Sequence, residues 1–232
     1  SNMFGLVKFF DKCELAGIKP ISGCSLNVIF DGDKDSHELL CLAKTNNGHK
    51  NLMKIISSAH NNYSYSSPII QFKDLTELND DIVVISGGKN SHIFEYLRRN
   101  NMADAENKID QFTKYFKDDF VLEIQKTNRE DELEFIKNIL PLSIKKGIPI
   151  VATNDVLFST QNDYEIHETK VCINTGRTLN DPNREKSFSD QQYFKSSEEM
   201  TDLFKESSSF IDNTNEISKK CNVSLKTKGY FL

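Results

Sequence analysis

The stretch DIVVISGG, residues 81–88, decides the fold class. Four β-branched residues, Ile82 to Ile85, follow one another, and two glycines soon close the run. Such a short apolar run is typical of a buried strand that leads into a tight loop. Its neighbours along the chain then decide whether the strand belongs to a parallel sheet.

On the C-terminal side of this stretch, helix and strand patterns alternate. Apolar residues spaced three and four apart predict a helix over 102–116, FVLEI (120–124) predicts a strand, and IPIVA (148–152) predicts another. Between the last two lies a further helix pattern, bent at Pro141, with this apolar face: Leu133, Ile136, Leu140 and Ile144. The alternation predicts βαβ units and a parallel sheet.

The flanking regions complete the α/β pattern. The expected elements are a helix over 6–16, strands over 26–30 and 39–43, a helix carrying Leu52, Ile55, Ile56 and Ala59, and a helical C-terminal third with a polar loop over 179–190. Reactive groups of parallel sheets gather at the carboxyl ends of the strands. Gly87-Gly88 and Asn154-Asp155 occupy two such ends.

Composition excludes several classes of protein. The net charge of −5 and the scattered lysines and arginines argue against a nucleic-acid-binding face. Five cysteines without CxxC spacing predict free thiols in a reducing compartment. No apolar run approaches the roughly 18 residues of a membrane span, and no secretory signal is visible.

Three positions are candidates for chemistry, and each also has a structural interpretation. Asp155 is either a metal ligand or a residue that caps the strand end, and without a metal its carboxylate is expected to be held by loop N–H groups or by a nearby cation. His167, one helical turn after Asp163, is either a base held by a carboxylate or a local helix contact. SGGKNS (86–91) is either a phosphate cradle or a tight turn, because it matches neither GxxxxGK[ST] nor GxGxxG.

Several segments, in order, resemble one family. These are GLVKFF, AGIKPISG, LAKTNNGHKNL, ISGG, VATNDV, HETKVCINTG, YFKSSEEM and KKCNV. Together they resemble the polymerase-and-histidinol-phosphatase (PHP) domain of bacterial DNA polymerase III alpha subunits, the replicative C-family polymerases. The resemblance runs over residues 4–232 and implies a PHP-type distorted seven-stranded βα barrel. It also implies a fragment in which the first strands, with their HxH pair, precede residue 4.

The resemblance further implies a metal cleft, whose ligand positions are compared with this chain one at a time. Ser25 stands where complete members have Glu, Gly88 where they have Cys, and Leu157 where they have the His of NDVH. Glu38 stands at a His position, with His37 one place early and therefore on the other face of the strand. Asp155 alone is kept, and Glu38 is a possible oxygen donor. The site is expected to be a remnant that holds no multinuclear metal cluster.

The implied function follows from this loss of ligands. The domain is expected to be an inactive scaffold on which the proofreading exonuclease subunit docks, beside other replicase subunits, in a cytoplasmic DNA polymerase. DNA and Mg²⁺ would be bound by other domains of the full-length protein. One alternative is a metal-dependent phosphoesterase or 3′-5′ proofreading nuclease, and another is a sugar-phosphate binder that uses residues 86–91.

Overall fold

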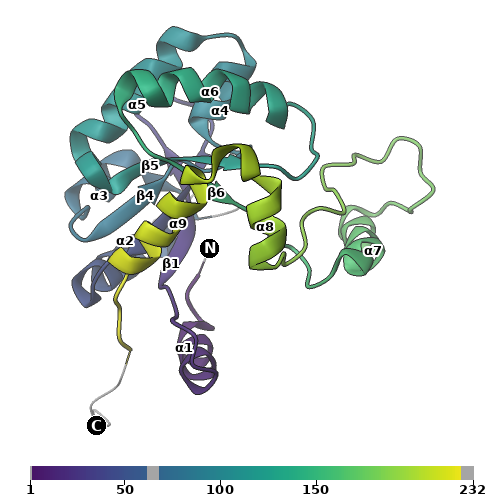
Figure 1. The fold of residues 1–232 in the computed structure, drawn as a ribbon, viewed down its shortest axis with the longest axis horizontal. Coiled ribbons are helices and arrows are strands. Elements are labelled where there is room, and N and C mark those ends of the chain that lie inside the picture. Colours follow the sequence, from purple (N-terminus) through teal and green to yellow (C-terminus); the bar gives the residue numbers. More distant parts are fainter. Residues whose placement is uncertain (1, 62–67, 226–232) are drawn as a thin grey trace. The chain divides into compact units, whose positions relative to one another are not determined.

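The computed structural model describes residues 2–61 and 68–225, which form two compact units (Figure 1). The first unit comprises residues 1–122 and 215–232, and the second comprises residues 123–214. The helices and strands of the first unit are α1 Leu6–Leu15, β1 Gly23–Ile29, β2 His37–Ala43, α2 Asn46–Asn61, β3 Ile70–Gln71, α3 Phe72–Glu77, β4 Ile82–Ile85, α4 His92–Arg98 and α5 Met102–Phe116. Those of the second are α6 Glu132–Lys146, β6 Ile150–Thr153, α7 Tyr164–Thr175 and α8 Ser197–Leu203, while β5 Phe120–Gln125 and α9 Ser209–Lys220 contribute to both.

The strands confirm the predicted α/β class. They form a six-stranded sheet in the order β3-β1-β2-β4-β5-β6, and in the described part of the chain this sheet is open rather than closed into a barrel. β4 pairs with β5 in parallel, as the alternation predicts, whereas β1 and β2 form an antiparallel hairpin around the acidic turn at 31–36. The two-residue strand β3, parallel to β1, was not expected from the sequence.

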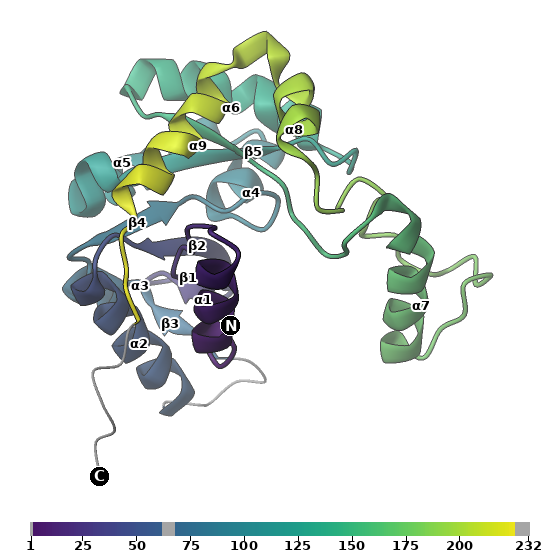
Figure 2. The ribbon, with the colours of Figure 1, turned by 60° about the horizontal axis from the view of Figure 1, so that its bottom comes forward.

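The core of the first unit explains why the stretch at 81–88 becomes a buried strand. All four residues of β4 are buried, and α2 packs against the neighbouring strands β1, β2 and β3 (Figure 2). Phe112 of α5 stacks on Phe120 at a ring distance of 4.8 Å and meets Phe30 and Phe72 edge-on. Edge-on and offset contacts of this kind suit the quadrupoles of aromatic rings.

The helix α6 is where the sequence-based prediction is right about the element and wrong about its face. The helix spans Glu132–Lys146 and continues through Pro141. However, Leu133 and Ile144 of the predicted buried face are 77% and 82% exposed. The buried residues are Glu132, Phe135, Ile139 and Leu142. Because apolar residues occur around most of this helix, their spacing identifies a helix without identifying its inner side.

Lys117, which follows α5, has a backbone conformation that disfavours a side chain. Its φ is 49° and its ψ is −123°. Non-glycine residues in such regions cost on the order of 1–3 kcal/mol. We expect Lys117→Gly to raise the free energy of unfolding by about 1 kcal/mol, because part of the relieved strain is offset by the greater freedom of glycine in the unfolded chain. Urea denaturation measures the gain. Lys117→Ala, which keeps the strained Cβ, is the control and should show no comparable gain.

Two further expectations concern thiols and membranes. All five cysteines are free, as their spacing predicts, and burial raises the pKa of the Cys24 thiol to about 12. Within residues 2–61 and 68–225, no helix has both the length and the apolar character needed to cross a bilayer.

Candidate functional site

The register of the β1–β2 hairpin fixes where the candidate residues of the first unit point. Ser25 lies opposite Leu40, and Glu38 lies opposite Asn27. Directly opposite residues share a face of the sheet, and successive residues alternate between faces. Ser25 and Glu38 therefore project from the same face, and His37 projects from the other.

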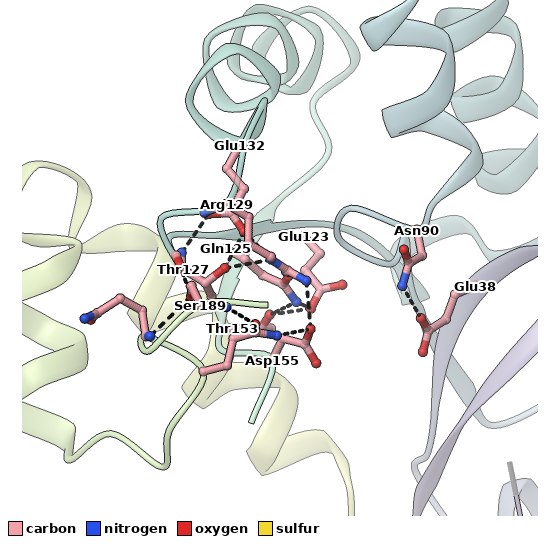
Figure 3. A network of polar contacts seen from close by, with 12 residues as sticks. Glu38, Asn90, Glu123, Gln125, Thr127, Arg129, Glu132, Thr153, Asp155 and Ser189 are labelled. Carbon is pink, nitrogen blue, oxygen red and sulfur yellow. Dashed lines mark hydrogen bonds and ion pairs between the residues drawn. The ribbon is translucent and has the colours of Figure 1, made fainter. Parts of the chain in front are cut away.

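The loop after β4 is fastened to Glu38. The Glu38 backbone N–H donates to the Asn90 carbonyl at 3.1 Å, and the Asn90 amide donates to Glu38 Oε2 at 3.1 Å (Figure 3). Gly87, with φ of 77°, comes so close that an added Cβ would lie 2.4 Å from the Glu38 carbonyl oxygen. Only glycine fits there, and the neighbouring Gly88 offers no side chain to a metal.

The segment SGGKNS is the tight turn that the sequence indicates. The Ser91 N–H donates to the Gly88 carbonyl at 3.1 Å, and the Ser91 hydroxyl caps α4 by accepting the Phe94 N–H at 3.0 Å. An N-cap of this kind stabilises a helix by about 1 kcal/mol. The turn thus has a structural explanation that involves no ligand.

His37 packs on the face opposite to Glu38. Its ring stacks on His92, with the ring centroids 4.1 Å apart and the planes 8° from parallel. Burial lowers the pKa of His37, although the carboxylates of Asp33, Glu95 and Asp35 partly oppose this shift. The histidine that lies one place early in the sequence is therefore not a replacement for a ligand at position 38.

In the second unit, Asp155 follows β6 and is held by a cation. Its Oδ2 accepts a hydrogen bond from an Arg129 guanidinium nitrogen at 3.0 Å and another from the Gln192 amide at 2.9 Å. The ion pair joins a nine-tenths buried arginine to a partly exposed carboxylate. Asp155 is therefore neither an unpaired former ligand nor only a cap of the strand end, because its charge is compensated by a guanidinium.

Arg129 is at the centre of a buried polar network (Figure 3). Its Nε donates to Thr127 Oγ1 at 2.8 Å and to Glu132 Oε1 at 3.0 Å, and a terminal nitrogen donates to Gln125 Oε1 at 2.8 Å. Glu132 also accepts the Thr127 backbone N–H at 2.7 Å. Charge-assisted hydrogen bonds from a planar guanidinium fix its position as well as its charge.

The network reaches the segment after Ser189. Gln192, which donates to Asp155, also accepts the Ser189 N–H at 2.9 Å through its own side chain. Its backbone carbonyl accepts the Leu157 N–H at 2.8 Å. The Leu157 side chain is 40% exposed and has no donor atom for a metal. Asp155 thus connects its own segment with the loop that carries Arg129 and the segment that carries Gln192.

The residues at the five family positions do not fit a multinuclear metal site. Ser25, Gly88 and Leu157 supply no carboxylate, imidazole or thiolate. Glu38 accepts from an amide, and Asp155 is already paired with a guanidinium. In the described part of each unit, no group of three histidine, cysteine, aspartate or glutamate side chains is placed to hold a metal ion. Divalent ions need several deprotonated ligands each.

His167 does not form the contact that its spacing suggests. The Asp163 carboxylate instead accepts both the N–H and the hydroxyl of Thr160 at 2.9 Å. The His167 ring packs against Phe158 and Phe188, at ring distances of 5.6 and 4.8 Å. Neither a base held by Asp163 nor an Asp163–His167 helix contact is present, because capping at Thr160 uses that carboxylate.

Sequence reasoning missed the residues that surround Asp155. Gln125 ends β5, Arg129 lies in the loop after it, and Glu132 begins α6. Gln192 lies 37 residues beyond Asp155. The available signal was the polar stretch QKTNRED (125–131) at the end of a predicted strand. The rule that reactive groups gather at strand ends applies to this stretch as well as to Asn154-Asp155.

Comparisons with known proteins identify the family to which the chain belongs. Residues 1–127 match the family model described as the PHP domain. This match covers more than half of the chain, and the chain therefore belongs to the PHP domain family.

Its full length is also similar to DNA polymerase III alpha subunits. The identity is 40% over 235 residues for the subunit of Escherichia coli strain K12, 38% over 234 residues for that of Pasteurella multocida and 40% over 234 residues for that of Pseudomonas fluorescens. The chain spans about a fifth of the length of these curated relatives (20% of each).

Proposed function

We propose that the chain is the PHP domain, over residues 4–232, of a cytoplasmic DNA polymerase III alpha subunit, and that it is a scaffold rather than an enzyme. In this proposal the full-length protein is a DNA-directed DNA polymerase, and its nucleotidyl transfer takes place in another domain that binds Mg²⁺ and DNA. The similarity to alpha subunits over the whole chain supports this assignment.

The observation that carries the inactivity proposal is the pairing of Arg129 with Asp155. A guanidinium 3.0 Å from the one retained ligand compensates the negative charge of the carboxylate. A metal ion that approached Asp155 would be repelled by the guanidinium. The side chain of Arg129 is 9% exposed and is tied to Gln125, Thr127 and Glu132, so moving it aside would break several buried hydrogen bonds.

The rival proposal, a metal-dependent phosphoesterase or proofreading nuclease, makes the opposite prediction in a metal titration. We expect calorimetry with Mn²⁺ or Zn²⁺ to show no stoichiometric binding. We also expect EDTA to leave the melting temperature unchanged and the chain to leave p-nitrophenyl phosphate and single-stranded DNA intact. Two or more ions per chain, roughly 4 Å apart in anomalous density near Asp155, would establish the rival.

Docking of the proofreading exonuclease subunit is the positive part of the proposal. We expect the purified chain to form a stable complex with that subunit in size-exclusion chromatography, with the same affinity in the presence of EDTA. Independence from EDTA matters because a scaffold without a metal has nothing for a chelator to remove. Failure of the two chains to co-elute at micromolar concentrations would contradict the docking and leave the metal result unaffected.

A further inference from the structure

The segment that follows α7 turns back along this helix (Figure 2). The side chains of this segment and of α7 line a groove. The groove has a volume of about 780 Å³, and both of its walls belong to the second unit. Side chains of α7 form one wall, and residues between Arg177 and Phe188 form the other. This groove plays no part in the Asp155 network, and the proposed scaffold function does not use it.

Cationic side chains predominate in the groove. Lys170, Arg177 and Arg184 line it, and Glu185 is its one carboxylate. The Glu185 carboxylate accepts a hydrogen bond from the Ser187 hydroxyl at 2.7 Å. Lys170, in contrast, forms no direct ion pair with any residue that the structure describes, although the pKa of Asp163 is lowered by hydrogen bonds from Thr160 and also by the charge of Lys170. The lining thus has more positive than negative groups, in a chain whose net charge is −5.

The two arginines are positioned by carboxylates outside the lining. Arg177 pairs with Asp181 at 3.0 Å, and Arg184 pairs with the buried Glu168. Each pair uses one terminal nitrogen and leaves other guanidinium N–H groups available. An arginine held in this way is preorganised as a donor for an oxyanion, since little side-chain entropy remains to be lost on binding.

The groove also contains buried polar atoms that lack a partner. The Arg184 side chain is only 10% exposed, and its Nε, a donor, has no hydrogen-bond partner in the described part of the chain. The Nδ1 atom of His167, which lines the same groove, is buried and unpaired as well, and so is Oε1 of Glu168, the carboxylate paired with Arg184. Buried polar atoms without partners are costly, and their presence in a native structure points to a ligand or to water.

We propose that this groove binds a phosphate group, with Lys170 and Arg177 at its open side and Arg184 at its base. A phosphate offers several acceptor oxygens and a charge that compensates Lys170. A carboxylate ligand would satisfy fewer of the donors. The phosphate belongs either to a small molecule such as pyrophosphate or to the backbone of single-stranded DNA, and the two sources share the same recognition chemistry.

The test uses pyrophosphate in calorimetry and a short fluorescent oligothymidylate in anisotropy measurements, at one fixed ionic strength. We expect saturable pyrophosphate binding that weakens roughly tenfold in Lys170→Gln, the loss typical of one charge-assisted hydrogen bond. Lys137→Gln on α6 is the matched control, because it removes the same charge from an exposed position away from the groove. Arg184→Lys keeps a cation beside Glu168 and should weaken binding without unfolding the chain.

The outcomes distinguish a small phosphate ligand from the backbone of single-stranded DNA, and they can also refute the proposed site. Displacement of pyrophosphate by the oligothymidylate assigns the groove to backbone phosphates, whereas binding of pyrophosphate alone assigns it to a small ligand. Absence of saturable binding overturns the proposal. An equal loss of affinity in Lys170→Gln and Lys137→Gln also overturns it, because the attraction would then be due to overall charge.

Discussion

Arg129→Gln is expected to lower the free energy of unfolding by about 3 kcal/mol, the lower end of the range for removing one partner of a buried ion pair. The side chains of Arg129 and Glu132 are 9% and 7% exposed, so the substitution leaves a buried carboxylate without its cation. Asp155 is more exposed, at 36%. Asp155→Asn should therefore cost less, roughly 0.5–2 kcal/mol.

Urea denaturation of the single and double variants measures both the losses and their coupling. We expect Asp155→Asn to cost clearly less in the Arg129→Gln background than in the wild type, because the two side chains interact directly. Arg98→Gln is the control: its side chain is 49% exposed and pairs with Glu95 at 3.3 Å, and exposed pairs contribute about 0–1 kcal/mol. If Arg129→Gln costs no more than Arg98→Gln, the network does not hold the remnant site together.

The stability of the first unit is expected to fall as the pH is lowered from about 6.5 to 5, by about 2 kcal/mol through His92 alone. His92 is 4% exposed and lies between the rings of His37 and Tyr96. Burial, with the positive charge of Lys108 and the proximity of His37, lowers the pKa of His92 to about 3. The Asp33 carboxylate, 3.4 Å from Nε2, does not overcome this desolvation.

The direction of the effect follows from which state binds the proton first. In the unfolded chain a histidine titrates near pH 6.5, whereas folded His92 stays neutral down to about pH 3. Between these values the unfolded state binds more protons, so its free energy falls relative to that of the folded state as the pH decreases. The full stability is present above the unfolded pKa and is progressively lost below it.

His92→Phe isolates this contribution, because phenylalanine keeps an aromatic ring between His37 and Tyr96 but cannot titrate. Thermal or urea unfolding of both proteins at several pH values between 7 and 5 should show a flatter profile for the variant. His49, whose pKa is also lowered by burial, remains in both proteins, and its contribution cancels in the comparison. Parallel profiles would contradict the assignment to His92.

The elements that could be predicted from the sequence are those whose apolar pattern is compatible with only one buried face. β4 is apolar at every position and is buried at every position. The helix α5 has its apolar residues on one side, and the predicted bounds agree with Met102–Phe116. The period of two along β2 also predicted that His37 and Glu38 face opposite ways. In α6 the pattern allowed several buried sides, and packing selected one that the spacing did not indicate.

The candidate site could be predicted only in part. The five family positions could be compared one at a time, but the cation that pairs with Asp155 comes from a distant part of the chain. Asp155 was expected to keep a nearby cation or hydrogen bonds from loop N–H groups, and a cation is present. That cation, Arg129, lies 26 residues earlier, and Gln192 lies 37 residues later. Contacts over such separations depend on the tertiary fold, and no local pattern in one sequence identifies them.

Because an arginine of the same chain lies beside Asp155, the site has its positive charge from the moment the chain is synthesised. A metal centre has to be loaded after synthesis, competes for its ion with every other ligand in the cell, and releases that ion as its ligands are protonated. The guanidinium of Arg129 is part of the chain itself and provides a positive charge without a bound ion. We therefore expect this region to fold to the same extent during metal starvation as during metal excess, with no chaperone or transporter needed to supply it.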